Sequence, residues 1–83
     1  MDRFELVAER KECYGKEKFN GRIATLDECA DQCTNVASMF VYGMEGTYEC
    51  GESGCNCICE TAASGDGKCE MKNNASARLY RFI

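Results

Sequence analysis

The stretch TLDECADQC, residues 25–33, places two cysteines four positions apart in a segment with helical character. Thr25 and Glu28 form a capping box, in which the threonine hydroxyl accepts a hydrogen bond from the Glu28 amide and the glutamate carboxylate reaches back to the Thr25 amide. One face of this helix carries Leu26, Cys29, Ala30 and Cys33. A helix of about nine residues is marginal on its own in water, so its two cysteines are expected to anchor it.

Eight cysteines in 83 residues indicate a disulfide framework, because a chain this short buries only a modest core. The alternative is a zinc protein. The chain has no histidine, so such a site would be all cysteine, and the paired CxxC spacing of zinc ribbons is absent. We therefore expect disulfides, no metal, no other cofactor, and a secreted or extracellular location or a secretory organelle.

The cysteines of the helix match those of a predicted strand, NCICE at residues 56–60. Residues four apart on a helix and two apart on a strand are both separated by about 6 Å along one face. Cys29 and Cys33 can therefore pair with Cys57 and Cys59 like two rungs of a ladder. The spacing does not decide which rung joins which pair.

The other four cysteines suggest two more bonds. Cys13 and Cys69 each lie just inside a predicted terminal strand, so we expect them to join the two ends of the domain. Cys50 and Cys55 would close the tight loop CGESGC. Either of these two could instead replace a strand partner of the helix.

The order of elements predicts a small α+β domain, with one helix on an antiparallel sheet. Alternating residues 4–9 indicate a first strand, and YGKEKFNGR at 14–22 is a polar stretch with turns at Gly15 and Asn20-Gly21. The further expected elements are the strand SMFVYG (38–43), a hairpin loop MEGT (44–47), a return strand from 48 to 50, NCICE, a polar loop TAASGDGK (61–68) and a closing strand ARLYRFI (77–83). We expect residues 1–83 to form a single module.

Charge is unevenly distributed along the chain. The net charge is −4, and residues 23–60 contain seven acids without any lysine or arginine. All ten basic residues lie in the two flanks, which argues against general nucleic-acid binding. No apolar run is long enough for a membrane span. The charged N-terminus shows no secretory signal, so we expect a module excised from a larger secreted protein.

Catalysis is not expected. Without histidine, the Ser–His and Cys–His nucleophile pairs cannot form, and the CxxC of a redox dithiol is missing. The adjacent acids Asp27 and Glu28 are explained by the start of the helix and its solvated face.

Taken together, the capped CxxxC helix, the FVY strand after it, the cysteine-bearing strand CICE and the cysteines near both ends resemble a PAN/apple domain over nearly the whole chain. The resemblance implies a helix packed across a curved antiparallel sheet, with helix cysteines bonded to strands, and Cys13–Cys69 as the linkage between termini found in the apple variant. Family members usually have a cysteine ahead of the aromatic strand, where this chain has Ala37-Ser38-Met39. Cys33 must then find its partner among residues 50–59.

The resemblance also implies a function: a non-catalytic extracellular binding or adhesion module that contacts proteins or carbohydrates. The cysteine surplus is similar to apple modules of apicomplexan microneme adhesins, which implies tandem copies in the parent protein and host-cell attachment. The alternatives are a free-standing secreted effector, such as a toxin or an anticoagulant-like antagonist, and a structural spacer repeat.

The expected partner is an extracellular protein or a cell-surface glycan. Tyrosines supply amphipathic contact area, and basic side chains bind carboxylates or sulfates. The candidate contact residues are Tyr14, Lys16, Lys18, Tyr42, Tyr48, Arg78 and Arg81. Asn74-Ala75-Ser76 is a candidate N-glycosylation site at Asn74.

Overall fold

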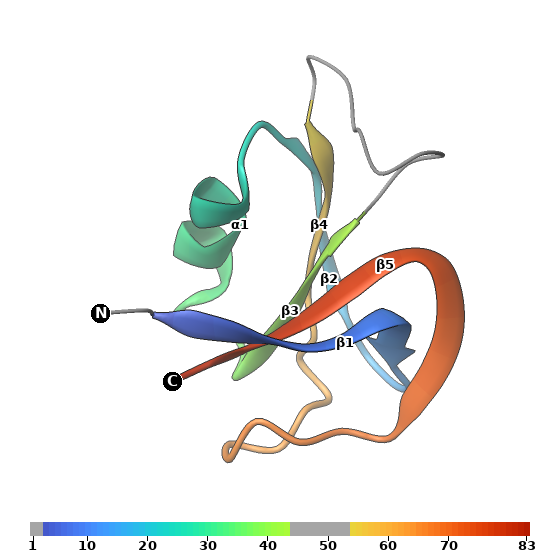
Figure 1. Cartoon of the computed structure of the whole chain (residues 1–83). Coiled ribbons are helices and arrows are strands. Elements are labelled where there is room, and N and C mark those ends of the chain that lie inside the picture. The colour runs from blue at the N-terminus through green and yellow to red at the C-terminus, as the bar shows by residue number, and fades with distance from the viewer. Residues whose placement is uncertain (1–2, 44–53) are drawn as a thin grey trace.

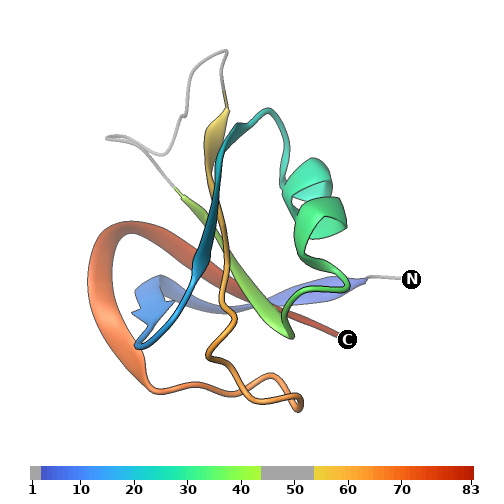
Figure 2. The same ribbon diagram turned by 180° about the vertical axis from the view of Figure 1, so that it is seen from behind.

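The structure, a computed structural model, describes residues 3–43 and 54–83 of the chain. Within these residues, five strands form one antiparallel sheet and a single helix covers one of its faces (Figures 1 and 2). The elements in chain order are β1 (Phe4–Cys13), β2 (Lys18–Ile23), α1 (Leu26–Cys33), β3 (Met39–Gly43), β4 (Cys55–Cys59) and β5 (Met71–Phe82). Their order across the sheet is β1-β5-β3-β4-β2. The expected α+β architecture, with one helix on an antiparallel sheet, is confirmed.

The first and last strands are neighbours, so the two ends of the described chain lie side by side in both views (Figures 1 and 2). Phe4 pairs with Phe82, and the amide of Ile83 donates a hydrogen bond to the Arg3 carbonyl at 2.9 Å. The pairing is interrupted near Arg10, whose φ of 58° marks a bulge in β1. There β5 contributes residues 74–77 without partners in the β1 register, and the strand arches away before returning (Figure 1).

The central strand β3 is buried on both faces, which explains its continuous apolar run. Phe40 and the half-buried Tyr42 point to the helix side, whereas Met39 and Val41 point to the other side. The helix-side cluster of buried residues contains Cys29, Ala30, Cys33, Phe40, Cys57, Cys59 and Tyr80. The opposite cluster contains Cys13, Met39, Val41, Ala77 and Leu79. The small domain therefore has a thin core on each face of one sheet.

Helix α1 begins where the capping box predicts. Thr25 is the N-cap residue in an extended conformation, and its hydroxyl accepts a hydrogen bond from the Glu28 amide at 3.1 Å. The buried face consists of Cys29, Ala30 and Cys33, three of the four positions expected there, while Leu26 is half-buried against the same cluster. The helix has eight residues, and its short length makes tertiary anchoring essential.

Two sequence-based expectations about local structure are wrong. Residues 18–23 form the edge strand β2 and not a polar turn region, because Asn20-Gly21 lies at a bulge between the pairs Phe19–Ile58 and Arg22–Asn56. The closing strand begins at Met71, well before residue 77. The predicted hairpin loop at 44–47 and return strand at 48–50 lie outside the described residues.

Candidate functional site

The loop between β1 and β2 is fixed by hydrogen bonds to the segment that follows β4. The Lys16 carbonyl accepts hydrogen bonds from the Ala62 amide at 3.0 Å and from the Thr61 hydroxyl at 2.9 Å. At the start of the loop, the Tyr14 amide donates to the Glu70 carbonyl at 2.8 Å. The backbone of the loop is therefore ordered before any partner arrives, which lowers the entropic cost of binding.

Gly15 allows this close approach. Its φ is 101°, a backbone conformation that disfavours other residues, and an added Cβ would lie 2.7 Å from the Cβ of Ala62. A side chain at this position would push the loop away from the segment that holds it. Gly15, which was expected to lie in a turn, therefore lies where the loop and the segment after β4 are in tight contact.

On this anchored loop and at the start of β2, large side chains point to solvent. Tyr14 is 51% exposed and Phe19 is 61% exposed, and Lys16 and Lys18 are exposed between them. The ammonium group of Lys72 lies 5.4 Å from the centre of the Tyr14 ring, within the range of a cation–π contact. We refer to Tyr14, Lys16, Lys18, Phe19 and Lys72 as the 14–19 surface.

Two positive charges of the 14–19 surface have no ion-pair partner among the residues that the structure describes. Within residues 3–43 and 54–83, no ion pair engages the ammonium group of Lys16 or Lys18. Lys72, by contrast, pairs with Glu12 at 3.3 Å. The surface therefore combines two aromatic rings with cations that remain available to an acidic ligand.

A buried carboxyl, Glu60, lies behind the loop. Its Oε2 accepts a hydrogen bond from the Cys13 amide at 2.5 Å, while Oε1 is buried without a hydrogen-bond partner among the described residues. Burial and the neighbouring carboxyl of Glu17, with a smaller effect of Glu12, raise the pKa of Glu60 to about 8. At neutral pH the side chain is therefore mostly protonated.

The sequon asparagine is engaged inside the domain. The Asn74 side-chain amide donates a hydrogen bond to Glu12, and its oxygen accepts from the Ser76 amide at 3.0 Å. The residue lies within β5 and is half-buried, not in the polar loop expected from the sequence. Attachment of a glycan would require the Asn74 nitrogen to leave Glu12.

The other candidate contact residues are spread over the fold. Tyr42 is half-buried, and its hydroxyl donates to the Ile23 carbonyl at 2.7 Å, so it supports the join between β2 and the helix. Arg78 and Arg81 pair with Glu9 and Glu5 directly across the β1–β5 ladder. Tyr48 lies outside the described residues. Of the seven candidates, the structure brings together Tyr14, Lys16 and Lys18.

The acidic face of α1 is also partly compensated. Arg3, at the start of the described chain, forms ion pairs with Asp31 at 2.6 Å and with Asp27 at 3.5 Å. Together with the β1–β5 pairs, this contact reduces the separation into a basic and an acidic side that the sequence suggests.

Three disulfides are present among the described residues. Cys13 bonds to Cys69, as expected, and the helix is joined to β4 by Cys29–Cys57 and Cys33–Cys59. The structure thereby settles the order of the two rungs that the spacing left open. Cys55 is disulfide-bonded, and its predicted partner Cys50 lies outside the described residues, so the Cys50–Cys55 bond stays a prediction.

Sequence reasoning missed Phe19, Lys72 and Glu60. Phe19 and Lys72 lie in segments for which the sequence predicted no strand. The orientation of their side chains relative to the sheet was therefore not predicted. Glu60 carried a signal: strand alternation places it on the same face as Ile58, which borders the second core cluster. Once β4 is known, Glu60 can therefore be recognised as a carboxyl that follows Ile58 on the same face of the strand.

Comparisons with known proteins found no match, whether among protein-family models, curated proteins or solved structures. In the described part of the chain, no helix is both long enough and apolar enough to cross a membrane. The function has to be argued from the geometry of the domain itself.

Proposed function

We propose that this chain is a non-catalytic extracellular binding module of the PAN/apple type, which engages a protein partner through the 14–19 surface. The observation that carries the proposal is the anchored loop and the start of β2, which present Tyr14 and Phe19 to solvent beside two lysines that form no ion pair with the described residues. Exposed aromatic residues on an ordered backbone are typical of the centres of protein interfaces.

The disulfide arrangement supports the PAN/apple part of the proposal. A helix bonded to the sheet at two positions, with a further bond between the segments next to the end strands, is what the resemblance implies. Several disulfides in so small a domain also favour an oxidising, extracellular environment. Tandem copies in a longer adhesin would raise the avidity of a module whose own contact surface is small.

The charge pattern favours a partner that presents acidic groups. Lys16 and Lys18 can form charge-assisted hydrogen bonds with carboxylates, whereas Arg78 and Arg81 are already paired within the sheet. Binding should weaken with salt, because exposed charges are screened over about 8 Å at physiological ionic strength. The aromatic part of the interface should persist in high salt.

The test is a binding screen of an oligomerised form of the domain against extracellular proteins, with a glycan array in parallel. Once a partner is found, Lys16→Gln/Lys18→Gln is compared with Arg78→Gln/Arg81→Gln, since both double variants remove two positive charges. We expect the loop variant and Tyr14→Ala to weaken binding at least about tenfold, the scale of interface hot spots, and the strand variant to leave it nearly unchanged.

Three outcomes would contradict the proposal. Loss of binding only in the arginine variant, with its thermal unfolding unchanged, would move the contact surface to the β1–β5 ladder. A signal confined to sulfated or sialylated glycans would replace the protein partner. Absence of any ligand in both screens would favour the spacer.

A further inference from the structure

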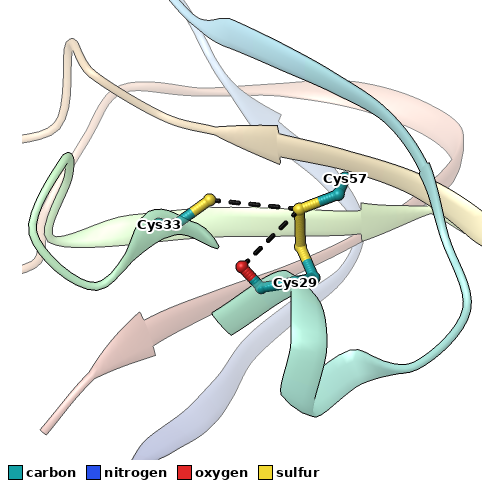
Figure 3. Close-up of side chains that lie close together, drawn as sticks. All are labelled: Cys29, Cys33 and Cys57. Carbon is teal, nitrogen blue, oxygen red and sulfur yellow. Dashed lines mark hydrogen bonds between the residues drawn. A yellow bond between two sulfur atoms is a disulfide. The ribbon is translucent and has the colours of Figure 1, made fainter. Parts of the chain in front are cut away.

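The two disulfides that hold the helix are in contact with each other. Cys33 Sγ lies 4.0 Å from Cys57 Sγ, although each is bonded to a different cysteine (Figure 3). The sulfur atoms of Cys29, Cys33 and Cys57 all lie within 4.8 Å of one another, and all three residues are buried. Cys59, bonded to Cys33 at 2.04 Å, supplies a fourth sulfur next to this group but outside its 4.8 Å limit.

This spacing is close to that of a zinc–thiolate centre. Zinc bound to four cysteines is tetrahedral with zinc–sulfur distances of about 2.3 Å, which places the sulfurs about 3.8 Å apart. The contact between the two disulfides already has nearly this length. After reduction, each bonded pair has to separate by about 1.7 Å to reach it. The Cys59 sulfur also has to move toward the other three by side-chain rotation.

We propose that the reduced form of this domain binds one zinc ion through Cys29, Cys33, Cys57 and Cys59. A thiol or phosphine reductant supplies two electrons and two protons to each disulfide, which becomes two thiols while the reductant is oxidised. Zinc then displaces four protons from the four thiols and forms four zinc–sulfur bonds. The same side chains thus anchor the helix in two ways, through two disulfides or through one metal ion.

A hydrogen-bond donor is already in place beside these sulfurs. The Asn20 side-chain amide lies 3.1 Å from Cys59 Sγ and 3.9 Å from Cys33 Sγ. Thiolates bound to zinc carry negative charge, and N–H donors around them orient the ligands and stabilise that charge. Asn20 reaches this position because β2 is a strand with its Phe19 side chain on the opposite face.

The proposal makes a structural demand that unspecific zinc binding does not. An eight-residue helix without its anchors should unfold in the reduced, metal-free chain. Zinc at the four sulfurs should restore it, because the metal reconnects the middle and the C-terminal end of α1 to β4. Recovery of helix should therefore follow zinc with a stoichiometry of one.

The first experiment uses the unmodified chain, fully reduced with a phosphine and then supplied with one equivalent of zinc. Helix content is followed by far-UV circular dichroism, and the cysteines left accessible are alkylated and mapped by mass spectrometry. We expect protection of Cys29, Cys33, Cys57 and Cys59, with alkylation of Cys13 and Cys69. Uniform alkylation, protection centred on Cys13 and Cys69, or zinc uptake without recovery of the helix would each overturn the proposal.

A matched pair of variants provides the control, since each retains four of the eight cysteines. One variant keeps the proposed ligands and carries serine in place of Cys13, Cys50, Cys55 and Cys69. The other keeps those four and carries serine in place of Cys29, Cys33, Cys57 and Cys59. Zinc should bind the first and restore its helix but not that of the second; equal affinity in both would refute the site.

Asn20→Ala tests the hydrogen-bond donor beside the sulfurs, in a chain that keeps all eight cysteines. It should weaken zinc binding by about tenfold, the lower end of such effects, while zinc still protects the same four cysteines. Unchanged affinity would remove Asn20 from the proposal.

Discussion

At the scale of single side chains, Glu60 links stability to pH, because it keeps a carboxyl group away from water against the Cys13 amide and beside Glu17. In the unfolded chain its pKa is about 4.5, and in the folded domain it is about 8. Between these values the folded chain holds a proton that the unfolded chain has released. The free energy of unfolding should therefore fall as the pH rises from about 4.5 to about 8, and then level off.

The measurement is denaturant unfolding at several pH values with the disulfides intact. Glu60→Gln keeps the acceptor for the Cys13 amide and supplies a donor toward Glu17, so the decline should become much shallower. Glu70→Gln, which alters an exposed carboxyl, should retain the decline of the unmodified domain. Equal slopes for Glu60→Gln and the unmodified domain would show that Glu60 is not the group responsible.

Among the elements, α1 depends on both its cap and its covalent anchors. Thr25→Ala removes the hydroxyl that accepts the Glu28 amide and should lower the free energy of unfolding by about 1 kcal/mol. Thr34→Ala changes a threonine at the exposed C-cap position. It should have a smaller effect, because the Thr34 side chain does not cap the N-terminus of the helix. Matched shifts in the denaturation midpoint for the two variants would contradict the capping assignment.

The elements also show what the sequence could predict. The helix, its cap and its ladder of cysteines were predictable, because the i, i+4 and i, i+2 spacings have few structural interpretations. The edge strand β2 was not, since Asn20-Gly21 is a strong turn signal and the bulge that accommodates Gly21 is visible only in the sheet. The first half of β5 was missed for a similar reason, because it is polar and arches outside the core.

The candidate site was partly predictable. Tyr14, Lys16 and Lys18 stand out as aromatic and basic residues in a polar stretch, but composition alone could not separate them from Arg78 and Arg81. The separation comes from the β1–β5 register, which places Glu9 opposite Arg78 and Glu5 opposite Arg81. Pairings between distant segments are tertiary information, and the local pattern does not contain them.

For the whole molecule, Cys13–Cys69 is the bond that spans the longest stretch of chain, with a sequence separation of 56 residues among the described disulfides. Replacing both cysteines with serine should cost about 4 kcal/mol in the chain-entropy model. Far-UV circular dichroism should still report the helix, because its own two disulfides remain. Cys29→Ser/Cys57→Ser is the contrasting variant: it opens a shorter loop but should lose helix signal.

The adjacency of β1 and β5 has a mechanical consequence. If the domain is pulled by its two ends, the load opens the β1–β5 ladder one hydrogen bond after another from Phe4–Phe82 inward. Because β5 also pairs with β3, from Met39–Arg81 to Gly43–Ala77, this second ladder has to break before β5 is released. Opening stops where Cys13 and Cys69 join the two segments covalently. At about 3.5 Å for each extended residue, the freed segments provide a tether of on the order of 80 Å, while the helix, β2, β3 and β4 remain shielded from tension. Force spectroscopy would record this as a first extension with a fixed limit.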